Sequence, residues 1–259
     1  MRGWVAAAAV ATLWGTAEAR KNAPPSGAAS QPASDRTVAT VLDPAALDAS
    51  LAALKGKQPG PRVGELLGRL GLPAPAVAAA KEVTVSTSQR HRKNLDADPA
   101  EESVVHVRVD GIPAPDHENA TVARHFVAWL DPVDNGLRLV GNQALEIGSC
   151  VVEGQLTLSF QRVHHATFDD TVLEWTDAPE CDGNLRGTNG MLVVTLERGR
   201  LDRILRFEAE FEDDRVSHET ISPARRVKFT GKVPREAQVL EGKRVKQRLR
   251  FDRARFVYR

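Results

Sequence analysis

After Val83, apolar and polar residues alternate along most of the chain with the period of two that is typical of antiparallel strands. Turn residues recur between these runs, and no run shows the 3.6-residue period of a helix. We therefore predict a mainly β fold over residues 83–259, either an antiparallel β-sandwich or an open or closed soluble β-barrel. The predicted strands are 83–86, 103–109, 122–130, 137–152, 155–163, 171–175, 191–197, 201–212, 226–230 and 245–258.

The registers of two hairpins can be predicted from the alternation. A two-residue turn at Glu153-Gly154 would pair 137–152 with 155–163, so that one face of the hairpin is apolar. A turn at Arg198-Gly199 would place Leu192 opposite Leu205 and Val194 opposite Arg203.

The two longest charged runs lie on late strands. In 201–212, Leu205, Phe207, Ala209 and Phe211 share one face, and charged residues share the other. In 245–258 the apolar residues change parity near Asp252, which predicts a β-bulge there.

Residues 37–82 have helical character and form a small N-terminal helical element. Asp43 is placed as an N-cap with Pro44 at the first helical position, and this helix should run to Lys55. A second helix is expected over 62–70, ended by Gly71, and a short third one over 74–81.

The first 36 residues predict export from a bacterial cell. Residues 1–19 have a basic start at Arg2, a short apolar run and Ala17-Glu18-Ala19, which together are typical of a signal peptide. The apolar run is shorter than the roughly 20 residues of a membrane span, and we expect no transmembrane segment after cleavage. Residues 20–36, rich in Ala, Pro and Ser, predict a disordered tether. The protein should be periplasmic or extracellular.

Two cysteines in an exported chain predict a disulfide between Cys150 and Cys181. Closing this loop would stabilise the fold by roughly 3 to 4 kcal/mol in the chain-entropy model. The register of the first hairpin puts Cys150 on the polar face, so the bond should strap the outer surface of a sheet.

The residues between the cysteines are the densest group of candidate acid/base or metal-binding side chains. His164, His165, Asp169 and Asp170 are the candidate catalytic residues of a metal-dependent or acid/base hydrolase. Neighbouring residues of a strand point to opposite faces, so His164 and His165 could share an ion only past the strand end. The interpretation that we favour is a solvated, acidic connecting loop.

A calcium loop is matched only loosely. Asp177, Asp182 and Asn184 surround Gly183, but the complete EF-hand pattern is missing. No zinc-ligand spacing, nucleophile elbow, P-loop or dinucleotide fingerprint occurs, and we expect no cofactor.

Anion binding is predicted at two places. The last strand is strongly basic, and Arg248 and Arg250 could bind a polyanion. The interpretation that we favour is that this strand lies opposite Glu208, Glu210 and Glu212, so that opposite charges pair across a sheet. His106 and His125, on the polar side of their strands, could form a second anion site.

The whole chain has a net charge of only +1 and 5% aromatic residues, which gives no general case for nucleic-acid binding. The preferred hypothesis is an exported soluble binding or interaction protein, whose partner is an unknown ligand or an envelope protein. A hydrolase and a polyanion-binding protein are the alternatives. The lining of the largest cavity should separate them, because a catalytic pocket would be lined by His and Asp.

Overall fold

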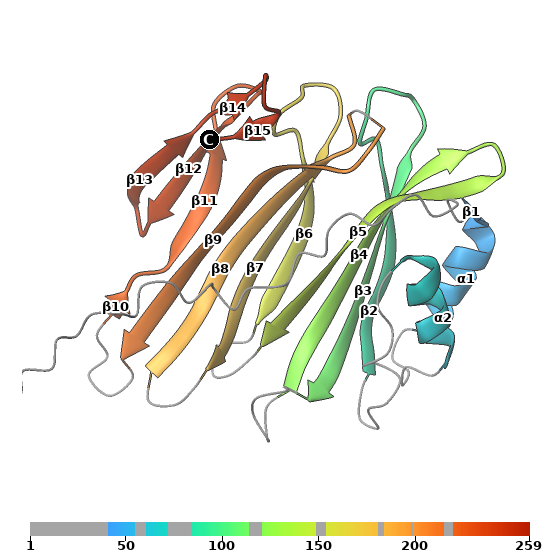
Figure 1. Ribbon diagram of the computed structural model, residues 1–259, viewed down its shortest axis with the longest axis horizontal. Helices are drawn as coiled ribbons and strands as arrows, with labels where there is room; N and C mark the ends of the chain where they lie inside the picture. The colour runs from blue at the N-terminus through green and yellow to red at the C-terminus, as the bar shows by residue number, and fades with distance from the viewer. Residues whose placement is uncertain are drawn as a thin grey trace, which may run out of the picture. The chain divides into compact units, whose positions relative to one another are not determined.

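The computed structural model describes residues 41–54, 61–71, 84–113, 121–148, 154–180, 184–197, 199–214 and 220–259 (Figure 1). The predicted signal peptide, tether and third helix lie outside the described residues. So do both cysteines, and with them the predicted disulfide.

The described chain is mainly β and antiparallel, as predicted, with a small helical element near its start and sheets that include a curled half-barrel (Figure 1). We name three of its sheets. The N-terminal sheet has the order β1 (Val41–Leu42), β5 (Gly136–Gly148), β4 (Thr121–Val133), β3 (Glu102–Pro113), β2 (Thr84–Lys93). The central sheet has the order β10 (Thr220–Ser222), β9 (Asp202–Asp214), β8 (Asn184–Thr195), β7 (Asp170–Glu180), β6 (Gln155–Gln161).

The third, the C-terminal sheet, has the order β11 (Arg225–Thr230), β12 (Glu236–Glu241), β13 (Arg244–Leu249). Two short strands, β14 (Phe251–Asp252) and β15 (Val257–Tyr258), pair with each other after it. All ten predicted strands correspond to observed ones, and the missed strands are β1, β10 and β12.

The two helices form where the sequence predicts them. Helix α1 (Pro44–Leu54) is capped by Asp43, whose Oδ1 accepts a hydrogen bond from Ala46 N at 2.6 Å. Helix α2 (Pro61–Arg69) is followed by Gly71 in the left-handed region, with a φ of 67°. The helices bury their leucines on one face of the N-terminal sheet, against Val105, Val107 and other apolar residues.

The inner strands of the N-terminal sheet, β3 and β4, are buried on both faces. Val104 and Trp129 point away from the helices and share a core with Leu173 and Leu192 of the central sheet. Trp129 Nε1 donates a hydrogen bond to Thr171 Oγ1 across this core, at 3.0 Å. The opposite face of the central sheet packs on the C-terminal strands in a further core, which includes Val239 and Tyr258.

The predicted hairpin between 137–152 and 155–163 is wrong. Strand β5 pairs with β4 and β6 pairs with β7, so the two segments belong to different sheets. Ile147, Leu156 and Leu158 do all lie in the core that these sheets share. Alternation identifies which face is buried, but two strands that pack across a core carry the same pattern as two that pair.

The second predicted hairpin is right in part. Val194 lies opposite Arg203 as predicted, but a bulge after Val193 places Leu192 opposite Arg206. The predicted faces of β9 are confirmed, since Arg206, Glu208 and Glu210 are exposed while Phe211 is buried.

The end of the chain differs from the single long strand that was predicted. The change of parity near Asp252 comes from a turn, not a bulge, and the chain reverses between β14 and β15. Asp252 Oδ1 accepts hydrogen bonds from Ala254 N and Arg255 N, and Phe256 takes a positive φ of 56°. Strand β13 pairs with β12, so the predicted pairing with Glu208, Glu210 and Glu212 of β9 is also wrong.

Candidate functional site

His164 and Asp170 lie together at the connection from β6 to β7. His164 Nδ1 is 2.7 Å from Asp170 Oδ1, and Nε2 is 2.8 Å from Glu197 Oε2. Burial lowers the pKa of His164, but its hydrogen bonds and charge interactions with Asp170 and Glu197 outweigh burial and raise it. Because each ring nitrogen already faces a carboxylate, neither remains to accept a proton from a substrate.

The other two catalytic candidates point elsewhere. The His165 ring stacks on Phe168 with centroids 4.1 Å apart, and its Nδ1 contacts Thr167 Oγ1 at 2.9 Å. The Asp169 carboxylate lies 3.9 Å from the guanidinium of Arg162. The structure therefore brings two of the four candidates, His164 and Asp170, together in one buried pair.

The candidate calcium ligands are described only in part. Asp177 Oδ1 accepts a hydrogen bond from Gly148 N at 2.8 Å, which ties β7 to the end of β5. Burial raises the pKa of Asp177. Asp182 and the side chain of Asn184 lie outside the described residues.

His106 and His125 lie together but are buried. Their side chains meet with His106 Nε2 3.0 Å from His125 Nδ1. Burial is the main cause that lowers the pKa of His106 to about 4 and that of His125 to about 3, helped by nearby positive charge. Both rings are neutral near pH 7, and the neighbouring Arg108 and Arg124 pair with Asp110 and Glu146.

The C-terminal sheet and the β14–β15 pair carry a large excess of positive over negative charge. Residues 225–259 contain thirteen Lys and Arg against three Asp and Glu, a net charge of +10. Since the whole chain has a net charge of +1, the residues before 225 have a net charge of −9. A separation of charge of this size is typical of proteins that bind polyanions.

The strand register places basic side chains from two strands on one face of the C-terminal sheet. Lys228 of β11 lies opposite Gln238 of β12, which lies opposite Arg248 of β13. Neighbouring strands are about 4.8 Å apart, so Lys228 and Arg248 form a row roughly 10 Å long. Arg226 and Arg250 extend this row along the sheet. We call Arg226, Lys228, Arg248 and Arg250 the basic surface; all four are exposed.

The acidic residues of this region neutralise only part of the charge. Glu236 lies 2.6 Å from Arg248 and 3.7 Å from Arg250. Hydrogen bonds from Gln238 and Arg248 lower the pKa of Glu236. Among the described residues, neither Arg226 nor Lys228 has a carboxylate within 4.0 Å. The sequence prediction missed these two because it did not find β12, although the alternation Arg226-Val227-Lys228-Phe229 already gives them a common face.

The aromatic residues of this region point away from the basic surface. Phe229, Phe251, Phe256 and Tyr258 belong to the core that the C-terminal strands form with the central sheet. The side chain of Tyr258 is buried, and its hydroxyl donates a hydrogen bond to the carbonyl of Val163 at 3.3 Å. The basic surface therefore offers charge without a platform on which bases could stack.

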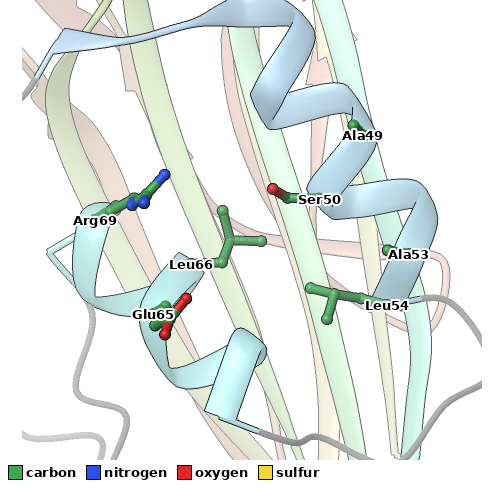
Figure 2. Close-up of a pocket in the computed structure, with 7 residues that line it drawn as sticks. All are labelled: Ala49, Ser50, Ala53, Leu54, Glu65, Leu66 and Arg69. Carbon is green, nitrogen blue, oxygen red and sulfur yellow. The ribbon is translucent and has the colours of Figure 1, made fainter.

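Two cavities lie beside the helices and beside the C-terminal sheet. The first, of about 330 Å³, lies between α1 and α2 and is lined by the small and apolar residues Ala49, Ala53, Leu54 and Leu66 together with Ser50, Glu65 and Arg69 (Figure 2). One of about 170 Å³ lies where β11 meets the central sheet, and Arg226 lines it with Glu174, Thr176 and Asn189. The residues that line these two cavities include no histidine.

Within the described residues, no helix is long and apolar enough to cross a membrane. Comparison with known proteins finds no matching family model, no similar curated protein and no similar solved structure. A functional proposal therefore rests on the chain's own geometry.

Proposed function

We propose that this protein is an exported, non-catalytic binding module that recognises an acidic polysaccharide through the basic surface. The observation that carries this proposal is the separation of charge, with a net charge of +10 confined to residues 225–259. Export is proposed from the signal-peptide pattern of residues 1–19. Outside the cell or in the envelope, carboxylated and sulfated polysaccharides are the polyanions that such a surface would meet.

An acidic polysaccharide suits the basic surface better than a nucleic acid does. Proteins that bind single-stranded nucleic acids stack bases on aromatic side chains, and the aromatic residues here face the core. A row of exposed Arg and Lys on a rigid sheet instead matches the repeating negative charges of an extended chain. Exposed charges of this kind contribute roughly 0.2 to 1 kcal/mol each, so several together give a measurable, salt-sensitive affinity.

The proposal is tested by retention of the full-length mature protein on immobilised heparin in a salt gradient. We expect the wild type to bind at about 0.15 M ionic strength. Replacing all four residues of the basic surface by Gln should weaken binding by about tenfold, which corresponds to 1.4 kcal/mol.

A matched control removes the same amount of charge elsewhere. Arg92, Arg162, Arg186 and Arg200 are exposed arginines of the first two sheets, with side-chain exposures of 59%, 58%, 54% and 65%. Their combined replacement by Gln should leave retention close to that of the wild type. Equal losses in the two variants would refute the basic surface as the site, and a duplex DNA that binds more tightly than heparin would refute the polysaccharide.

A further inference from the structure

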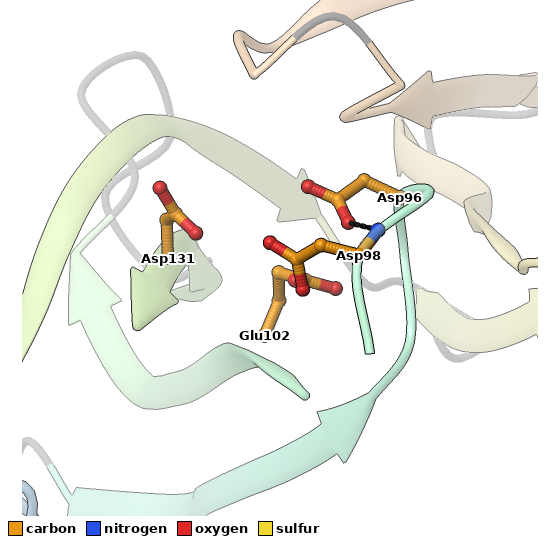
Figure 3. A group of neighbouring side chains, drawn as sticks. All are labelled: Asp96, Asp98, Glu102 and Asp131. Atoms are coloured by element: carbon orange, nitrogen blue, oxygen red, sulfur yellow. Dashed lines mark hydrogen bonds between the residues drawn. The ribbon is translucent and has the colours of Figure 1, made fainter. Parts of the chain in front are cut away.

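Four carboxylates meet at the end of the N-terminal sheet, away from the basic surface. Asp96 and Asp98 belong to the loop between β2 and β3, Glu102 begins β3, and Asp131 lies near the end of β4 (Figure 3). Each offers an oxygen, and these four oxygens lie within 4.8 Å of one another. No sequence pattern indicated this group, because Asp131 is distant in the chain.

Glu102 is a buried side chain with an unused oxygen. It is 0% exposed, and its Oε2 accepts a hydrogen bond from Leu95 N at 2.5 Å. Its Oε1 is buried and has no hydrogen-bond partner among the described residues. Asn94 Oδ1, in the same loop, is a second buried oxygen without a partner. Buried polar atoms are almost always satisfied, so two orphans beside a carboxylate cluster indicate a ligand.

The remaining carboxylates are held in a similar way. Asp96 Oδ1 accepts from Asp98 N at 2.8 Å, Asp98 Oδ1 accepts from Ala100 N at 2.7 Å, and Asp131 Oδ2 accepts from Arg138. One oxygen of each carboxylate is thus fixed by the protein. The other has no donor among the described residues.

Among the described residues, little positive charge lies next to the cluster. Arg138 is the cation that contacts it, and it binds only Asp131 at the edge. Burial raises the pKa of Glu102 to about 7, and the charges of Asp96 and Asp98 add to this while its hydrogen bonds oppose it. Burial likewise raises the pKa of Asp96. A bound cation would remove the repulsion and satisfy the buried oxygens together.

We propose that Asp96, Asp98, Glu102 and Asp131 bind a calcium ion. The donors are all oxygens, which favours a hard cation over zinc or copper. Calcium–oxygen distances of about 2.3 to 2.6 Å place ligand atoms up to about 5 Å apart across the ion, whereas magnesium at about 2.0 to 2.1 Å needs a tighter cage. The ion would fix the β2–β3 loop to the end of β4. This site is independent of the proposed polysaccharide binding.

The test is calorimetric titration of CaCl2 into the full-length mature protein after removal of divalent ions with EDTA, at pH 8 so that Glu102 is ionised. We expect one calcium per chain with a Kd in the range of extracellular calcium modules, about 0.1 to 1 mM. Magnesium should bind at least about tenfold more weakly. A parallel melting curve in 10 mM calcium should show a higher Tm than in EDTA, because the ion binds only the folded state.

Two variants and a control locate the ion. Glu102→Gln removes the buried charge, and Asp98→Asn alters an exposed residue whose replacement leaves the core intact. Each should weaken calcium binding at least tenfold and reduce the calcium-dependent rise in Tm. Glu146→Gln, an exposed carboxylate paired with Arg124, changes the charge equally and should leave both measurements unchanged.

Absence of heat and of a Tm shift in the wild type up to 10 mM calcium would overturn the proposal. So would unchanged affinity in both site variants. If Glu102→Gln does not fold, Asp98→Asn decides alone. Retention on heparin in EDTA reports only on the basic surface, so failure of either proposal can be told from failure of the other.

Discussion

Asp170 and Glu102 are both carboxylates with no exposed surface, and each begins a strand. Asp170 accepts hydrogen bonds at both oxygens, from the backbone N–H groups of Val163 and His164 and from the His164 ring. Glu102 accepts one hydrogen bond, at Oε2, and its Oε1 has no donor among the described residues. A buried charge whose partners are complete acts as part of the scaffold, whereas an incomplete one indicates a site for something the protein binds.

The largest change in the free energy of unfolding is expected at Asp170, whose carboxylate has a full set of hydrogen-bond donors. Asp170→Ala should lower the free energy of unfolding by about 3 to 5 kcal/mol, because it leaves His164 and two backbone N–H groups buried without an acceptor. Urea unfolding measures this loss. Asp169→Ala, next to it in the chain but partly exposed, should change stability by less than about 0.5 kcal/mol. Similar values for the two variants would contradict a scaffold role for Asp170.

Replacing Glu102 should raise the free energy of unfolding, whereas replacing Asp170 should lower it. A carboxyl whose folded pKa is about 7, against 4.5 unfolded, holds its proton in the folded state and loses it in the unfolded state between these values. In EDTA it therefore lowers stability as pH rises from 4.5 through 7. Glu102→Gln should be more stable than the wild type by about 2 to 3 kcal/mol at pH 8 and nearly equal at pH 4.5. Denaturant unfolding at both pH values gives this difference, and a Gln variant less stable at pH 8 would show that the cluster tolerates the charge.

The pair of His106 and His125 is intermediate between Asp170 and Glu102. The two rings contact each other, but His125 Nε2 is buried and has no hydrogen-bond partner among the described residues. Both pKa values are depressed, so the unfolded chain binds protons first as pH falls below 6.5. Stability should therefore decrease by about 2 kcal/mol or more between pH 7 and pH 5 because of this pair. His125→Leu should reduce that decrease. Comparing variant with wild type at each pH isolates the pair from Glu102 and His164, whose raised pKa values act in the opposite direction.

The smallest effect on stability is expected at an exposed carboxylate. Glu236 contacts Arg248 and Arg250 at the surface, where ion pairs contribute little to folding. Glu236→Gln should leave the unfolding midpoint unchanged. It should also release two arginines of the basic surface and raise the salt concentration needed to elute the protein from heparin. Weaker retention would mean that Glu236 orients these arginines instead of competing with the ligand.

Local patterns in the sequence were sufficient to predict both helices and most of the strands. Asp43 and Pro44 start α1, Gly71 follows the end of α2, and alternation located ten strands and the faces of β9. These features depend on near neighbours in the chain, through capping, backbone freedom and side-chain period. Short strands such as β12, with an interrupted pattern, were missed.

Pairing and sites were decided by the tertiary structure. The sequence could not show that β5 and β6 pack across a core instead of pairing, because both arrangements need the same alternation. The sequence offered His164 and Asp170 as catalytic candidates, with a solvated loop as the preferred interpretation, and it could not show that Glu197 lies against the second ring nitrogen of His164. The sequence could not place Asp131 beside Glu102, because the burial of a carboxylate and its distance from other carboxylates depend on contacts between distant segments. The sequence determined the residue types and the buried face of each predicted strand. Only the tertiary contacts decided which buried polar groups have hydrogen-bond partners.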